Sequence, residues 1–281
     1  MRRTLPVIAT LLALGFGGSA LAEGHEARMV HPDWSFAGPF GTFDQGQLQR
    51  GFKVYREVCS TCHTMNLVSF RNLGEKYGPF WDEKHPNPND NPYVKSIAAE
   101  YDINDIDTDT GDAMKRKGTP ADRIPSPFPN EFAARASNGG ALPPDLSVMA
   151  KARHGGADYI YSLLTGFREP PAGLTMPTGM NYNMSMAGDL TTQWAGDKHH
   201  VPQGGFIAMK QPLTKDKVSF DDGTPSSIEQ EARDVTAFLV WASEPKQTER
   251  KRLGMWVMIY LVILAGLAYG SYRTVWKNES H

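Results

Sequence analysis

Two cysteines and a histidine form the clearest chemical motif of this chain. Residues 59–63 read Cys59-Ser60-Thr61-Cys62-His63, and the sequence contains no other cysteine. In a Cys-x-x-Cys-His run the two thiols can bond covalently to the vinyl groups of a porphyrin, and the adjacent imidazole can reach the iron. The spacing therefore predicts one haem c, attached through Cys59 and Cys62, with His63 as an axial ligand.

Two other interpretations of the motif are weaker. A structural zinc site needs about four ligands, and no second cysteine pair exists to supply them. A thioredoxin-like redox pair normally lies beside a βαβ unit in a reducing compartment, whereas the residues before Cys59 have a helical pattern and the chain carries an export signal.

That export signal covers residues 1–22. Arg2 and Arg3 give a positive start, residues 7–16 are apolar, and Ala20 and Ala22 form a small-x-small cleavage site. Bacterial c-type haem is attached outside the cytoplasm, so the signal peptide and the haem motif agree. We expect residues 23–249 to form a periplasmic haem domain.

A second apolar segment, residues 253–272, contains no charged side chain. At about 1.5 Å per residue it matches a hydrocarbon core of about 30 Å. Aromatic residues that suit the membrane interface lie near its ends: Trp256, Tyr269 and Tyr272. We expect a transmembrane anchor with a basic flank over 250–272 and a cytoplasmic tail over 273–281, hence a single pass through the bacterial inner membrane. The denser positive charge before the span mildly opposes this orientation, but long domains translocate largely regardless of charge.

Helical patterns at both ends of the haem domain match the crossed-helix core of small c-type cytochromes, so we expect such a core here. Asp44 can cap a helix that runs into the haem motif, with Gly51 and Tyr55 on the same side as Cys59. Near the other end, Ser226 and Glu229 have the spacing of a capping box. An apolar stripe follows, before Pro245: Ile228, Ala232, Val235, Phe238, Leu239 and Ala242.

The central part of the chain predicts shorter helices within irregular segments. Helical patterns cover residues 67–77 and 157–164, and residues 81–129 are expected to form a surface insertion with a short helix near 93–100. The predicted fold class is mainly α: a cytochrome c-like haem domain with long irregular insertions plus one C-terminal transmembrane helix. The formal net charge of −2 at pH 7 argues against a nucleic-acid-binding surface.

The sixth iron ligand cannot be chosen from spacing alone. A methionine thioether there suits electron transfer, whereas an open position suits catalysis or gas binding. Met65 follows His63 too closely, and Met255 and Met258 lie in the apolar span. Met176 and Met209 then compete about equally.

Several segments after the haem motif occur in the order typical of one known family. They are residues 138–147 (NGGALPPDLS), 152–159 (ARHGGADY), 163–171, 207–209, 220–225 and 238–245. The chain thus resembles the bacterial cytochrome c1 family, the haem subunit of ubiquinol–cytochrome c oxidoreductase, over nearly its whole mature length. The resemblance implies Met209 as the second axial ligand, Arg153 and Tyr159 as partners of the haem propionates, and Asn138 and Pro144 in the loop that lines the haem.

The same resemblance implies a function. The haem would accept one electron from a Rieske iron–sulfur protein and pass it to a c-type cytochrome, within a dimeric multi-subunit complex that contains cytochrome b. The enzyme activity is that of the quinol–cytochrome c reductase, whose quinol site is not in this chain. The alternatives are a free-standing membrane-anchored cytochrome c carrier and a haem peroxidase with a vacant distal site.

The chain departs from some members of this family near Met209, and the role of its acidic residues 100–112 has two interpretations. Some bacterial relatives brace the methionine loop with an extra cysteine pair, which this chain lacks, so packing or hydrogen bonds must steady Met209. Acidic residues between 100 and 112 can steer a basic partner or keep an exposed loop soluble. An EF-hand-like loop from Asp105 fits poorly, because Gly111 stands one position late and Arg116 replaces the closing Glu.

Overall fold

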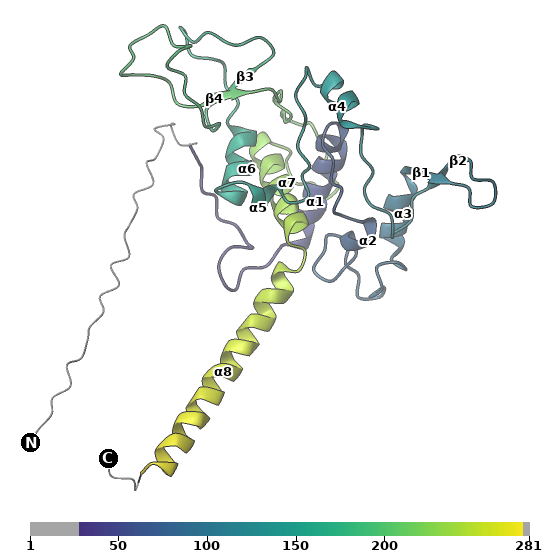
Figure 1. The fold of residues 1–281 in the computed structure, drawn as a ribbon, viewed down its shortest axis with the longest axis vertical. Helices are drawn as coiled ribbons and strands as arrows, with labels where there is room; N and C mark the ends of the chain where they lie inside the picture. Colours follow the sequence, from purple (N-terminus) through teal and green to yellow (C-terminus); the bar gives the residue numbers. More distant parts are fainter. Residues whose placement is uncertain (1–27, 278–281) are drawn as a thin grey trace, which may run out of the picture.

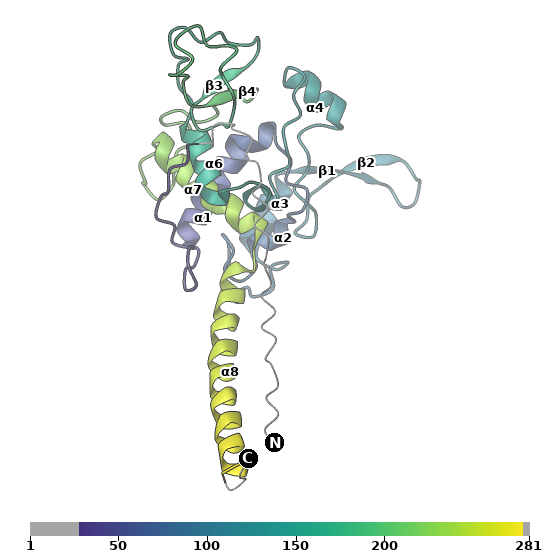
Figure 2. The same ribbon diagram turned by 60° about the vertical axis from the view of Figure 1, so that its left-hand side comes forward.

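A computed structural model describes residues 28–277. The predicted signal peptide (1–22) and the end of the predicted tail (278–281) lie outside these residues. A mainly helical domain, as predicted, is joined to one long straight helix, α8, which extends away from it (Figures 1 and 2).

Two crossing helices form the centre of the domain: α1 (Gln45–Glu57) and α7 (Ile228–Ser243). The rings of Phe52 and Tyr55 on α1 pack against Phe238 on α7, with centroids 5.6 and 5.7 Å apart. The two backbones touch at Gly51, where a Cβ atom would lie 2.1 Å from the carbonyl oxygen of Asp234. The predicted crossed-helix core is therefore confirmed.

The start of α1 is confirmed and the start of α7 is corrected by one residue. The Asp44 side chain accepts a hydrogen bond from the Gln47 amide, as expected of an N-cap. On α7 the cap is Ser227, whose hydroxyl oxygen accepts from the Gln230 amide at 3.1 Å. The predicted capping box of Ser226 and Glu229 is wrong, because the Ser226 hydroxyl donates instead to Glu231 Oε1 at 2.5 Å.

The helix predicted over residues 67–77 is much shorter. Helix α2 (Phe70–Leu73) is opened by a capping box of Ser69 and Asn72 and ends before Gly74. The other shorter helices are η1 (Cys59–Thr61), a 3-10 turn, α3 (Pro92–Ala99), α4 (Glu131–Ser137), α5 (Met149–Ala152) and α6 (Gly156–Thr165). Of these, α3 and α6 were predicted. Val94 and Ile97 of α3 are buried in the main core, so the 81–129 segment is only partly a surface insertion.

Two antiparallel strand pairs were not predicted. β1 (Asp102–Ile106) pairs with β2 (Ala113–Lys117) in a hairpin that projects from the body (Figures 1 and 2). β3 (Asn181–Asn183) pairs with β4 (Gly205–Ile207), and we call these two strands the β3–β4 ribbon. The ribbon lies at the end of the domain remote from α8 (Figures 1 and 2).

Acidic residues of β1 face basic residues of β2. Asp102 lies 2.9 Å from Lys117, and Asp105 lies 2.5 Å from Arg116, which also binds Asp122 at 2.7 Å. The acidic stretch is therefore partly neutralised within its own hairpin.

Helix α8 (Gln247–Val275) is long and apolar enough to cross a membrane, and none of its most apolar window is buried in the domain. Its basic first turns are bound to the domain. Lys251 Nζ donates to the carbonyl of Phe36 at 2.5 Å, and Arg252 donates to the Tyr77 hydroxyl at 3.1 Å.

Candidate haem site

The haem motif forms a tight turn at the end of α1. The amides of Cys62 and His63 donate to the carbonyl of Cys59 at 3.1 and 2.9 Å, and the Thr61 hydroxyl donates to the Val58 carbonyl at 2.8 Å. Cys59 and Cys62 are free thiols. Because α1 is fixed by its crossing with α7, the turn holds both sulfurs and the imidazole on a rigid support.

The chemistry of Cys59 does not suit dithiol exchange. Burial raises the pKa of this thiol to about 12. A reactive cysteine of the thioredoxin type needs a pKa lowered toward neutrality, so that the thiolate forms. The raised pKa therefore weakens the redox-pair interpretation.

One ring nitrogen of His63 forms a hydrogen bond within the protein, which leaves the other able to bind a metal ion. His63 Nδ1 lies 2.8 Å from the carbonyl oxygen of Pro144. A carbonyl can only accept, so Nδ1 carries the proton and the lone pair lies on Nε2. Burial lowers the pKa of His63, although the hydrogen bond to Pro144 partly opposes this, so the ring stays neutral at pH 7. A neutral imidazole oriented through Nδ1 is the usual state of a histidine that binds iron.

The Pro144 carbonyl is itself held in place by a clasp, which we define as the contacts of Asp145 and Ser147 with residues 64–67. Asp145 Oδ2 accepts from the Thr64 hydroxyl at 2.7 Å and from the Asn66 amide at 2.8 Å. Ser147 Oγ accepts from the Leu67 amide at 3.0 Å. Burial alone would raise the pKa of Asp145, but hydrogen bonds from Asn66, Ser147 and Thr64 outweigh it, so the pKa lies below its ordinary value.

The donor set fits a covalently bound haem. It offers two free thiols at Cys-x-x-Cys spacing and, beside them, an imidazole whose Nε2 is free to ligate. The sequence predicted these residues together with Pro144, and the structure brings His63 and Pro144 into contact. Asp145 and Ser147 were part of the recognised segment 138–147, but their pattern alone did not reveal that they form a clasp.

The other predicted site residues are placed separately. Tyr159 Oη lies 4.0 Å from Met186 Sδ, and Arg153 is exposed with one guanidinium nitrogen 3.1 Å from the carbonyl of Ala152. Asn138 ends α4 and donates to the carbonyl of Ala134 at 2.7 Å. Met209 is half-buried just after β4. The hydrogen bonds of residues 28–277 connect none of these four to His63.

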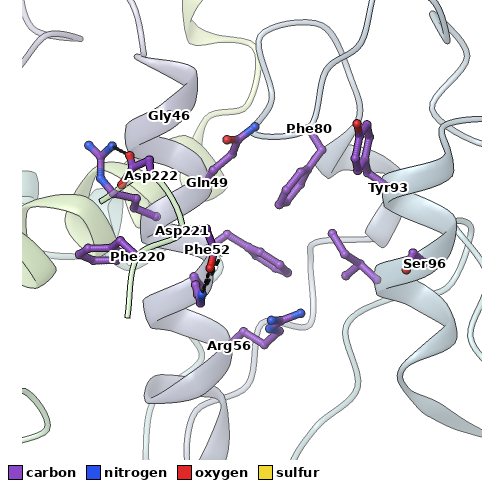
Figure 3. A pocket seen from close by; sticks show the side chains of 13 residues that line it. Gly46, Gln49, Phe52, Arg56, Phe80, Tyr93, Ser96, Phe220, Asp221 and Asp222 are labelled. Atoms are coloured by element: carbon purple, nitrogen blue, oxygen red, sulfur yellow. Dashed lines mark hydrogen bonds and ion pairs between the residues drawn. The ribbon is translucent and has the colours of Figure 1, made fainter. Parts of the chain in front are cut away.

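A hollow on another side of α1 does not belong to this site. Phe52, Phe80 and Tyr93 line it together with cations of α1 (Figure 3). Those cations are paired with carboxylates: Arg50 with Asp222 and Asp234, Lys53 with Asp221, and Arg56 with Glu100. Each of these cations is therefore paired with at least one carboxylate.

Comparison with known proteins agrees with the site. A model described as the Cytochrome C1 family matches residues 34–279. Cytochrome c1 of Rhodospirillum rubrum is 39% identical, over 98% of this chain and 97% of that protein. The mitochondrial cytochrome c1 heme protein of Kluyveromyces lactis is 44% identical, over 87% of this chain and 75% of that protein.

A longer relative is also similar. Cytochrome b/c1 of Bradyrhizobium diazoefficiens is 42% identical over 97% of this chain, which spans 39% of the length of that protein. The family match over most of the described residues and the oriented imidazole beside two free thiols lead to one conclusion: the chain belongs to the cytochrome c1 family of haem proteins.

Proposed function

We propose that this chain is the haem c electron-transfer subunit of a membrane-bound quinol–cytochrome c reductase. The observation that carries the proposal is the oriented His63, whose Nδ1 is bound to the Pro144 carbonyl, directly after the Cys59 and Cys62 pair. When bound, haem c supplies a one-electron couple that the side chains of this protein lack. The protein supplies attachment, axial ligands and a fixed environment.

Each site residue has a proposed role. Cys59 and Cys62 would hold the group covalently, and His63 Nε2 and the Met209 thioether would ligate its iron. Two protein ligands on the iron would leave no position for a substrate, which suits electron transfer. Pro144 orients His63 through its carbonyl.

Three further residues act at the edge of the group. Arg153 and Tyr159 are proposed to bind its propionates, and Asn138 lies in the loop that lines it. The exposed guanidinium of Arg153 has five N–H donors in a planar fork, a geometry that matches a carboxylate.

The proposed topology combines α8 with the export signal and the haem motif. Residues 1–22 are removed after export, residues 23–249 form the periplasmic domain, residues 250–272 anchor it, and residues 273–281 reach the cytoplasm. Within residues 28–277 the most apolar window of α8 is not buried, while Lys251 and Arg252 near its start bind the domain, and both observations support the anchor.

The proposed partners are a Rieske iron–sulfur protein as electron donor, cytochrome b in the same dimeric complex, and a c-type cytochrome as acceptor. The names of two relatives support this assembly: the Bradyrhizobium protein is a cytochrome b/c1, and a Candida albicans relative is a cytochrome b-c1 complex catalytic subunit. Quinol oxidation is assigned to the partners.

Purification of the intact complex from membranes tests the proposal. A tag on this chain should recover a di-haem cytochrome b, and the preparation should reduce cytochrome c when quinol is added. Isolation of this chain without cytochrome b or quinol-dependent activity would favour the free-standing carrier. A high-spin ferric spectrum would favour the peroxidase.

A further inference from the structure

We propose that Asn181 is a positioning residue that fixes the Met209 segment, in place of the disulfide that this chain cannot form. The inference rests on the proposed role of Met209 as an axial ligand. It concerns how the protein keeps that ligand in place, and therefore the potential and accessibility of the bound iron.

Asn181 connects the end of the β3–β4 ribbon to Met209. Its backbone pairs with Ile207, the last residue of β4, so the strand ladder stops two residues before Met209. Its side-chain Nδ2 donates to the carbonyl of Met209 at 3.2 Å and approaches the carbonyl of Ile207 at 3.5 Å. The side chain thus extends the strand pairing as far as the proposed ligand.

The strand that carries Asn181 is bound to the body of the domain. Two residues further along β3, Asn183 Nδ2 donates to the carbonyl of Leu163 at the end of α6, at 2.8 Å. The Met184 amide donates to the carbonyl of Gly166 at 2.9 Å. Residue Asn183 is fully buried, so these bonds are shielded from water. The Asn181 bond therefore ties Met209 to α6, and not merely to another loop.

The ribbon is also rigid in itself. Tyr182 of β3 forms a small core cluster with Leu174 and Leu190, and Phe206 of β4 packs on this cluster. Gly204 has φ of +116°, and a Cβ atom there would lie 2.6 Å from the carbonyl oxygen of Asn183. The close approach of the two strands leaves little freedom at the base of the Met209 segment.

The chemistry of the amide explains why this position matters. An ionised carboxylate at position 181 would have no donor for the Met209 carbonyl, and an aliphatic side chain would have none either. Without that bond, the segment of residues 208–212 that follows the ribbon would have no hydrogen bond to the side chain at position 181. If the Met209 thioether moved away from the iron, the reduction potential would fall and the sixth coordination position would open. Both depend on which ligand binds the iron and on the contacts that hold that ligand in place.

The test uses the full-length protein in its membrane complex, with Asn181→Asp and Asn181→Leu. Both variants should weaken or lose the far-red sulfur-to-iron band, lower the reduction potential and allow the ferrous haem to bind carbon monoxide. Covalent haem per polypeptide should stay unchanged, which shows that folding and attachment are intact.

Tyr182→Phe is the matched control. It removes the hydrogen bond from the Tyr182 hydroxyl to the Gln203 carbonyl in the same ribbon but leaves Asn181 and Met209 untouched. This variant should keep the band and the potential and should not bind carbon monoxide. Equal effects of Tyr182→Phe and Asn181→Leu, or no effect of Asn181→Leu, would overturn the inference.

Met209→Leu separates the inference from the proposed function. If the band survives in Met209→Leu, the ligand assignment itself is wrong. If Met209→Leu loses the band while both Asn181 variants keep it, the ligand assignment stands and the positioning role of Asn181 is rejected.

Discussion

Gly51 of α1 and Asp234 of α7 meet backbone to backbone at the centre of the domain. A Cβ atom on Gly51 would lie 2.1 Å from the carbonyl oxygen of Asp234 and 2.7 Å from Phe238 Cβ. The fully buried carboxylate of Asp234 also binds Arg50 of α1, with Nε and Oδ2 2.7 Å apart. Because α1 leads directly into Cys59, this crossing fixes the support of the haem motif.

Replacement of Gly51 by alanine should destabilise the protein. The added methyl group must push the helices apart, which costs about 1–3 kcal/mol or more. Thermal unfolding of the detergent-solubilised protein measures the loss. Gly46→Ala on the same helix is the control, since a Cβ there would meet only Asp44 Oδ1 at 3.5 Å and Arg50 Nη1 at 3.7 Å. Equal melting temperatures for the two variants would contradict the close crossing.

The clasp of Asp145 should make stability depend on pH. The pKa of this carboxyl is lower in the folded protein than its unfolded value of about 3.9, so its contribution is complete above about pH 5 and is lost as the pH falls through the folded-state pKa. Asp145→Ala should cost about 1–3 kcal/mol at pH 7, because the donors from Thr64 and Asn66 lose their acceptor.

Melting temperatures measured from pH 7 down to pH 3 check this prediction. Asp145→Ala should flatten the acid side of the curve relative to that of the unaltered protein. If the melting temperatures of Asp145→Ala ran parallel to those of the unaltered protein, protonation of Asp145 would not contribute to the loss of stability in acid.

Arg116 should hold the β1–β2 hairpin in place. Its guanidinium binds Asp105 of β1 and, through two nitrogens at 2.7 and 2.8 Å, Asp122 beyond the hairpin. Arg116→Gln should therefore increase the rate of limited proteolysis within residues 102–117. Lys115→Gln removes the same charge from the same strand and serves as the control; equal cleavage rates in the two variants would argue against an anchoring role.

Removal of the exposed part of α8 should release the domain from the membrane. A chain that ends at Arg252 keeps the contacts of Lys251 and Arg252 with the domain but lacks the apolar segment. We expect it in the soluble periplasmic fraction, whereas the full chain should need detergent for extraction. Retention of the shortened chain in washed membranes would mean that another surface binds the lipid or a membrane partner.

The choice between Met209 and Met176 has a spectroscopic test. Met209→Leu should abolish the far-red sulfur-to-iron band and lower the potential, whereas Met176→Leu should keep both, because Met176 packs on the small core cluster of Leu174, Tyr182 and Leu190. The opposite result would assign the ligand to Met176.

Local patterns predicted the elements that position the haem motif. The Asp44 cap, the stripe of α7 and the apolar span all depend on residues close in sequence, where side-chain periodicity carries the information. The Ser226 error arose because Ser226 and Ser227 are adjacent, and only the contact with Glu231 shows which one caps.

Contacts between residues distant in sequence could not be predicted from local patterns. The hydrogen bond of Asn181 to Met209 spans a long loop, and the bond of His63 to Pro144 joins segments 81 residues apart. Three-residue strands such as β3 and β4 are too short to show alternation, and α2 is shorter than its apolar pattern because Gly74 ends it early. The resemblance to a family supplied Met209 as the proposed ligand, whereas the hydrogen bond from Asn181 to its carbonyl required the structure.

The central claim is that a porphyrin is bonded covalently to Cys59 and Cys62. The most direct measurement is the pyridine haemochrome spectrum of the denatured protein after extraction with acidified acetone. The account predicts one haem c per polypeptide in the unaltered chain and none retained in a Cys59→Ser, Cys62→Ser double variant. Absence of haemochrome absorbance from the extracted, unaltered polypeptide would contradict it.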